Sequence, residues 1–248
     1  GGKTSLMNTL GKEFASHGYP TLLTTTTHIM KPDFLSDESY IENEDLGQLA
    51  NIFTNLKKNT LPLAALGIPE KVVNSNVKWR SPSSDFCEKI AEFSKKFSTK
   101  NPYKFLKILC EGDGSKRLPI KLPKDGEPVF FPKTDTVISV IGLSCLGKPI
   151  KETLFRYELL PNLTSLDNYF IKSLQSADIV TTDFLYRLCL SEKGLRKNIT
   201  SQKFCIIFNQ ADILDEKALA EVITLRNQLQ TKGICSHIIS VKNNYIIN

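Results

Sequence analysis

The sequence predicts an α/β fold built on a mostly parallel β-sheet with helices on both faces. Two observations support this prediction. Apolar segments of strand length alternate along the chain with segments of helical periodicity, and polar or acidic residues follow directly after several of the apolar segments. Such alternation is typical of parallel sheets, in which each helix crosses back over the sheet. A length of 248 residues suffices for one large α/β domain or two small ones. We expect a single domain over residues 1–248.

The expected elements follow from local periodicity. A first helix is predicted by the spacing of Met7, Leu10 and Phe14. Residues 19–25 form a β-rich run after a glycine and predict the first strand. Further helices are expected at 46–56, 84–97, 151–160, 164–175, 184–190 and 215–230, and further strands at 61–66, 105–110, 137–142, 204–208 and 234–241.

Local signals mark several boundaries of these elements. Gly67 and Pro69 are expected to stop the strand at 61–66. Thr181, before the apolar run at 184–190, predicts an N-cap. Residues 74–85 are polar although they contain the only tryptophan, Trp79, and no strand is predicted there.

The first five residues, Gly1-Gly2-Lys3-Thr4-Ser5, match the closing half of a phosphate-binding loop. In such a loop, glycine backbone amides approach the phosphates, a lysine reaches the β- and γ-phosphates, and a threonine hydroxyl binds Mg²⁺. The preceding strand and first glycine are not in the sequence, so we expect the first strand of the sheet to be missing from this chain. The alternative is a glycine-rich start of an ordinary helix.

Acidic residues follow the predicted strand at 105–110. Glu111 and Asp113 lie in the turn Glu-Gly-Asp-Gly, and a carboxylate at the end of an apolar strand is what a Mg²⁺ site beside a phosphate-binding loop requires. Thr4 and Asp113 are therefore the candidate metal ligands. Lys3, Glu111 and Asp113 are the candidate catalytic residues.

A second motif follows the predicted strand at 204–208. Asn209-Gln210-Ala211-Asp212 stands where GTPases carry N-K-x-D. The aspartate of that motif accepts hydrogen bonds from guanine, and the asparagine supports the loop. Gln210 replaces the usual lysine, and Asp113 is followed directly by Gly114 and not by the D-x-x-G spacing of a Ras-like switch. The alternative interpretation of Asp212 is ordinary turn chemistry.

Composition argues against several other classes of protein. The net charge of +6 is mild, and its lysine-rich stretches lack a recognised nucleic-acid-binding module, so no nucleic acid is expected. No apolar segment has the length of a membrane span. The six cysteines are widely spaced without a C-x-x-C pair, which favours buried thiols in a reducing cytoplasm over a disulfide framework or a zinc site.

The chain resembles the YqeC-type accessory proteins associated with selenium-dependent molybdenum hydroxylases. The residues that carry the resemblance are spread in order along the chain, apart from a divergent region at 31–104: they are 1–7, 24–29, 111–115, 118–123, 127–129 with Pro132, 140–143, 146–149, 181–183 and 209–212.

This resemblance implies a P-loop NTPase-like fold and a role in maturing the cofactor of such a hydroxylase. It also implies GTP or ATP with Mg²⁺ as ligands, and a hydroxylase or its maturation proteins as partners. The contacts to nucleotide would come from the phosphate loop and the base loop, namely Gly1, Gly2, Lys3, Thr4, Ser5, Asn209 and Asp212. Both a nucleoside triphosphatase and a binding module without hydrolysis fit these residues.

Overall fold

The structure is a computed structural model that describes residues 1–54, 61–100, 105–163 and 178–247. The chain divides into two compact units. The first, here called the N-terminal unit, contains Lys3–Gly114 and Val129–Lys133, and the second, the C-terminal unit, contains Gly1–Gly2, Ser115–Pro128 and Thr134–Asn248. Each unit is described by itself, and the single domain expected from the sequence stays a prediction. The helix expected at 164–175 lies outside the described residues.

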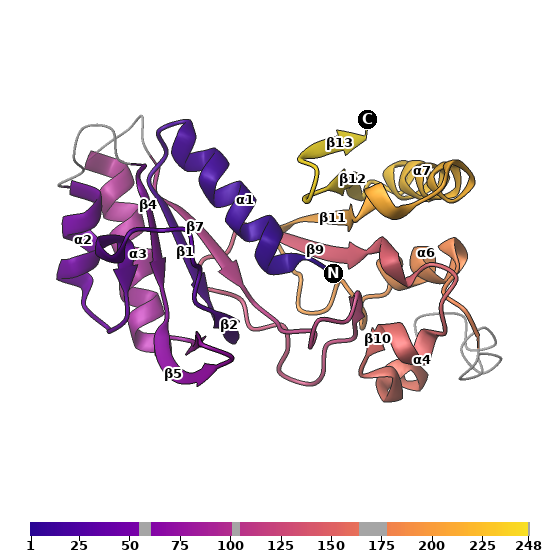
Figure 1. The fold of residues 1–248 in the computed structure, drawn as a ribbon, viewed down its shortest axis with the longest axis horizontal. Helices are drawn as coiled ribbons and strands as arrows, with labels where there is room; N and C mark the ends of the chain where they lie inside the picture. The colour runs from indigo at the N-terminus through magenta and orange to yellow at the C-terminus, as the bar shows by residue number, and fades with distance from the viewer. Residues whose placement is uncertain (55–60, 101–104, 164–177, 248) are drawn as a thin grey trace. The chain divides into compact units, whose positions relative to one another are not determined.

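A four-stranded parallel sheet forms the centre of the N-terminal unit (Figure 1). Its strands, in spatial order, are β3 (Tyr40–Ile41), β4 (Leu63–Leu66), β1 (Thr21–Thr25) and β7 (Lys107–Glu111). Side chains alternate between the two faces of a strand, so neighbouring residues of β1 pack into different layers. Leu23 packs with Met7 of α1 (Lys3–Ser16) on one face.

The opposite face of the same sheet is covered by two further helices. Leu22 of β1 packs with Leu49 of α2 (Leu46–Thr54) and with Ile90 of α3 (Ser84–Lys100). All three side chains are fully buried. Helices on both faces of a parallel sheet, as predicted, are therefore confirmed for this unit (Figure 1).

The structure adds an antiparallel sheet that the sequence did not predict. It consists of β2 (His28–Met30), β6 (Asn76–Arg80) and β5 (Ile68–Val73), in that order. Gly67 ends β4 as expected, but β5 begins directly after it. Trp79 on β6 is fully buried, and its indole Nε1 donates a hydrogen bond of 2.9 Å to Glu42 Oε1. Val77 and Trp79 alternate with polar residues along β6 and pack in the same cluster, so the strand carries the period-two pattern of a half-buried strand within an otherwise polar segment.

The C-terminal unit contains a second four-stranded sheet, ordered β13-β12-β11-β9. Strands β9 (Thr136–Gly142), β11 (Lys203–Asn209) and β12 (Cys235–Ser240) are parallel, and β13 (Tyr245–Ile247) is antiparallel. Helices α6 (Thr182–Leu190) and α7 (Glu216–Thr231) share a buried core with Ile206, Phe208 and Ile238 of this sheet. Thr181 caps α6, because its hydroxyl accepts a hydrogen bond of 3.1 Å from Phe184 N.

The helix predicted at 151–160 is interrupted in the structure. Helix α4 (Ile150–Thr153) is followed by strand β10 (Leu154–Phe155) and then by a 3-10 helix at Tyr157–Asn162. Strand β10 pairs in parallel with β8 (Ile120–Lys121). Shorter 3-10 helices lie at Asp37–Ser39, Leu143–Cys145 and Ala211–Ile213.

A partly buried ion group lies beside this small strand pair. The Glu127 carboxylate accepts two hydrogen bonds from the Arg156 guanidinium, at 2.5 and 2.9 Å, and its Oε2 lies 2.6 Å from Lys121 Nζ. The side chains of Lys121, Arg156 and Glu127 are 5%, 15% and 19% exposed. The hydrogen bonds from Arg156, together with Lys121, lower the pKa of Glu127 to about 2.

The predicted α/β class with mostly parallel sheets is confirmed, although the described strands form two four-stranded sheets and two smaller ones in place of a single sheet. Each helix among the described residues falls short of the length and apolar character that a membrane span requires.

Candidate functional site

The first turn of α1 meets the end of β7 in the N-terminal unit. The Thr4 hydroxyl donates a hydrogen bond of 2.5 Å to Glu111 Oε2, and Lys3 Nζ lies 3.4 Å from Asp113 Oδ1. Both side chains of the Lys3–Asp113 pair are about one-fifth exposed, at 21% and 23%. The structure therefore brings two predicted site residues of the first turn of α1 together with two of the acidic turn, more than one hundred positions further along the chain.

Parallel strand pairing fixes the position of Glu111. Thr25 is the last residue of β1 and lies opposite Glu111, the last residue of β7. The Glu111 carbonyl accepts hydrogen bonds from Thr25 Oγ1 at 3.0 Å and from Thr26 N at 3.1 Å. The carboxylates thus lie at the C-terminal edge of the sheet, where open α/β sheets bind ligands, beside the N-terminus of a helix.

Burial and hydrogen bonding act in opposite directions on the Glu111 carboxyl. Desolvation by burial raises its pKa, while the hydrogen bond from Thr4 and the charge of Lys3 partly offset that increase. Ser5, the remaining residue of the predicted loop on this helix, is exposed in the first turn of α1. The group thus combines one cation, one hydroxyl and two carboxyl groups next to a helix N-terminus.

The first two residues of the phosphate motif belong to the C-terminal unit. Asn209, the last residue of β11, donates a hydrogen bond of 3.2 Å from Nδ2 to the Gly1 carbonyl. Gly2 has a φ of 87°, and a Cβ atom added to it would lie 2.3 Å from Asn209 Nδ2. A left-handed φ and this close approach both require glycine at position 2. The start of the chain and the predicted base loop therefore contact each other within one unit.

Asp212 is held by a residue that the sequence analysis missed. The Ser240 hydroxyl, at the end of β12, donates a hydrogen bond of 2.6 Å to Asp212 Oδ1. The next residue, Val241, donates from its backbone N to Asn209 Oδ1 at 3.0 Å. The sequence did offer a signal for Ser240, which is a polar residue at the end of a predicted strand. Neighbouring parallel strands end at the same edge of a sheet, so such a residue is a candidate for the site.

The base loop has a conformation that positions its two polar residues. Gln210 adopts the left-handed region with a φ of 74°, and its Oε1 accepts a hydrogen bond of 3.4 Å from Ser144 N. The Gln210 side chain therefore connects the loop at 209–212 to the backbone of Ser144. Among the described residues, Ser240 is the one side chain that donates a hydrogen bond to the Asp212 carboxylate, through Oδ1.

The predicted site residues thus fall into two groups. Lys3, Thr4, Glu111 and Asp113 meet in the N-terminal unit, whereas Gly1, Gly2, Asn209 and Asp212 lie in the C-terminal unit. One of the points at which the chain passes from one unit to the other is the peptide bond between Gly2 and Lys3.

Fold and residues together define an α/β protein with mostly parallel sheets and polar groups at the C-terminal ends of their strands. The YqeC protein family matches residues 1–158, and the chain belongs to that family. A relative, the uncharacterized protein YqeC of Escherichia coli (strain K12), is 27% identical over 188 residues, which cover 73% of this chain and 63% of that protein. No solved structure matches the chain.

Proposed function

We propose that the protein is a P-loop NTPase-like, Mg²⁺-dependent nucleotide-binding accessory protein for the maturation of the cofactor of a selenium-dependent molybdenum hydroxylase. The meeting of Lys3 and Thr4 with Glu111 and Asp113 at the edge of a parallel sheet is the observation that supports nucleotide binding. Membership of the YqeC family and the resemblance to hydroxylase accessory proteins support the pathway.

The donor atoms of this group fit a phosphate and a hard cation. Mg²⁺ prefers oxygen ligands and is usually held by one or two protein oxygens together with substrate phosphates and water. The Thr4 hydroxyl and the Asp113 carboxylate supply such oxygens. Lys3, which pairs with Asp113 here, would pair with the phosphates, and the Asp113 carboxylate would contribute an oxygen to the cation. Mg²⁺ would neutralise phosphate charge at this position.

Two variants on the same helix test the phosphate site. Lys3→Ala removes the proposed phosphate contact, and Lys12→Ala removes an exposed lysine that lies over the Phe34 ring at 3.9 Å. We expect Lys3→Ala to weaken GTP or ATP binding at least ~10-fold, because a hydrogen bond to a charged group contributes about 1.5–3 kcal/mol. Lys12→Ala should bind as the unchanged protein does. Equal affinity of all three proteins would refute the phosphate site.

The Asp212 environment favours guanine as the base. The carboxylate accepts one hydrogen bond, from Ser240 to Oδ1, so both oxygens keep lone pairs that would accept from a pair of adjacent N–H donors on the base edge. Titration of GTP against ATP, each with Mg²⁺, measures this preference. Equal affinities for the two nucleotides would contradict the assignment of Asp212.

A second candidate function is nucleotide binding without hydrolysis. Glu111 is held by Thr4 and Asp113 by Lys3, and the sequence lacks the D-x-x-G spacing that positions water in Ras-like GTPases. Phosphate release that depends on Lys3 would support the triphosphatase. Tight binding without such release would support the binding module.

The pathway is tested in cells. Deletion of the gene should abolish the activity of the selenium-dependent hydroxylase, and the unchanged gene, but not the Lys3→Ala form, should restore it. Normal hydroxylase activity in the deletion strain would refute the pathway. The proposal also places the protein in the cytoplasm, which agrees with six cysteines that are all free thiols.

A further inference from the structure

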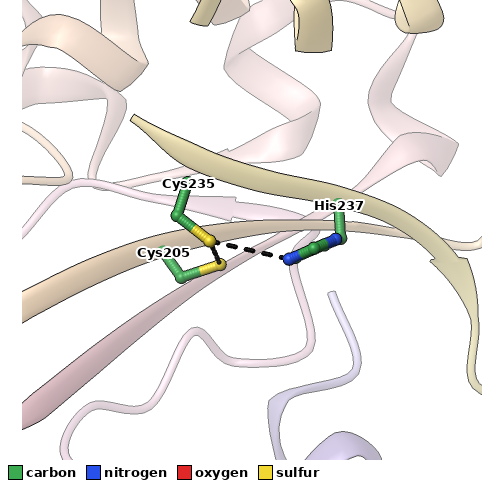
Figure 2. Close-up of side chains that lie close together, drawn as sticks. All are labelled: Cys205, Cys235 and His237. Atoms are coloured by element: carbon green, nitrogen blue, oxygen red, sulfur yellow. Dashed lines mark hydrogen bonds between the residues drawn. The ribbon is translucent and has the colours of Figure 1, made fainter. Parts of the chain in front are cut away.

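Two cysteines and a histidine converge on one face of the sheet in the C-terminal unit (Figure 2). Cys205 on β11 lies directly opposite Cys235 on β12, and His237 follows two residues later on β12. Residues two apart on a strand point to the same face, and the intervening Ser236 is buried while Cys235 and His237 are exposed. Strand pairing thus gathers three metal-binding side chains that show no ligand spacing in the sequence.

The distances between their ligand atoms fit one small metal ion. Cys235 Sγ lies 3.0 Å from Cys205 Sγ and 3.5 Å from His237 Nε2, and all three atoms lie within 4.8 Å of one another. A tetrahedral zinc ion with its ordinary bond lengths separates two sulfur ligands by about 3.8 Å, and a sulfur from a nitrogen ligand by about 3.6 Å. The sulfur–nitrogen distance already matches, and the two sulfurs need to separate by about 0.8 Å. Rotation of the exposed Cys235 side chain provides that movement.

The surroundings of the cluster also suit a thiolate site. Ile138 of β9 lies opposite Cys205 on its other side, and Ile207 lies opposite His237, so apolar side chains flank two of the three ligands. An apolar shell limits competition from water for the metal. Cys235 and His237 are exposed, which leaves a path for an ion to enter.

We propose that Cys205, Cys235 and His237 bind one thiophilic cation of the Zn²⁺ class, with a fourth coordination position open to water or another exogenous ligand. Two sulfurs and one imidazole are ligands that zinc prefers, and three protein ligands with an open position are typical of zinc sites that bind a further molecule. Among the described residues this is the one cluster of three such ligands within reach of a single ion. The inference is independent of the proposed nucleotide site.

The cysteine spacing favours buried thiols over a zinc site, because no cysteine pair has C-x-x-C spacing. Cys205 and Cys235 are adjacent across strands and not along the chain, an arrangement that C-x-x-C spacing does not reveal. The structure corrects the expectation that the cysteines are buried thiols. Cys87, Cys145 and Cys189 are buried, but Cys110 and Cys205 are partly exposed and Cys235 is exposed.

The experiment is a titration of the full chain with Co²⁺, which substitutes for Zn²⁺ and reports its ligands by colour. The protein is first freed of metal with a chelator and kept reduced with a phosphine. We expect one equivalent of Co²⁺ to produce a sulfur-to-cobalt charge-transfer band and the strong visible bands of tetrahedral cobalt. Zn²⁺ should bleach both. Cobalt bound to oxygen ligands at Thr4 and Asp113 would lack the sulfur band. The spectrum therefore distinguishes metal bound at the cysteines from metal bound at the proposed nucleotide site.

Variants of the two exposed ligands identify the site without disturbing the core. Cys235→Ser and His237→Gln should each weaken Zn²⁺ affinity at least ~100-fold, since loss of a direct ligand exceeds the 10–100-fold effect of outer-shell changes. Cys110→Ser and His17→Gln, which alter a cysteine and a histidine of the other unit, should leave affinity unchanged. Circular dichroism checks that each variant is folded.

Three results would overturn the proposal. The first is a cobalt spectrum without a sulfur band in the unchanged protein. The second is an affinity that Cys235→Ser and His237→Gln leave intact. The third is a Cys205–Cys235 disulfide found by mass spectrometry in the protein as purified, together with no metal binding after its reduction.

Discussion

Replacing Glu127 by glutamine should destabilise the C-terminal unit strongly. Glutamine keeps the shape of the side chain but removes the charge that Lys121 and Arg156 share. The two cations, at 5% and 15% exposure, would then lie close together with the Glu127 charge removed. Loss of one partner from a buried ion group leaves an uncompensated charge, which is costly.

The magnitude follows from the pKa of Glu127. A carboxyl whose pKa falls from its ordinary value of 4.5 to about 2 on folding contributes about 3 kcal/mol to stability at neutral pH. Because the folded pKa is the lower one, this contribution is fully present above pH 4.5 and is lost as the pH falls towards 2. The Glu127→Gln variant should therefore differ most from the unchanged protein at neutral pH, and the difference should shrink in acid.

Native-state hydrogen exchange measures the effect where it occurs. At neutral pH, amides of β9, β11 and β12 that open with the whole unit should exchange ~100-fold faster in Glu127→Gln, which is the rate equivalent of about 3 kcal/mol. Glu158→Gln, which alters an exposed carboxylate of the same unit, should change stability by less than about 0.5 kcal/mol. Urea denaturation at several pH values between neutral and 3 measures how the difference in unfolding free energy between Glu127→Gln and the unchanged protein depends on pH. Protection that is the same in both variants would refute the reasoning.

Two further predictions concern other parts of the chain. A Cβ atom at Gly67 would lie 2.3 Å from the Trp79 ring, so Gly67→Ala should destabilise the N-terminal unit by about 1–3 kcal/mol, read from tryptophan fluorescence in urea. A midpoint unchanged from the parent protein would contradict this packing. Ser240→Ala removes the hydrogen bond to Asp212, so the preference for GTP over ATP should fall ~10-fold, as a charge-assisted bond implies. An unchanged preference for GTP over ATP would show that Ser240 does not contribute to base recognition.

Local sequence was sufficient for most of the described helices and for the parallel strands β1, β4, β7, β9, β11 and β12, whereas the other strands were not predicted. The helix after Lys3, the N-cap at Thr181 and the strand before Asn209 were all predicted close to their observed bounds. Each depends on side chains within a few residues, either through apolar periodicity or through a single capping hydroxyl. The strand β6 was missed although Val77 and Trp79 alternate with polar residues, because the alternation covers only five residues in a polar segment.

The candidate site also combines features that the sequence predicts with contacts that only the structure shows. The glycine, lysine and threonine of the first four residues and the acidic turn at Glu111 could be recognised as motifs, since each is a short pattern with a known chemistry. Their contact could not, because the pairing of Thr4 with Glu111 spans 107 positions. Ser240 lacked a motif of its own and became visible only where β12 ends beside β11.

Sequence by itself therefore determined the α/β class, the order of the longer helices and of six parallel strands, and the residue types at the ends of those strands. Tertiary structure decided which of those residues meet: Lys3 with Asp113, Asn209 with Gly1, and Cys205 with Cys235 and His237. The physical reason is that strand register and sheet order follow from burial of whole faces, and a shift of register by one residue moves every side chain to the opposite face.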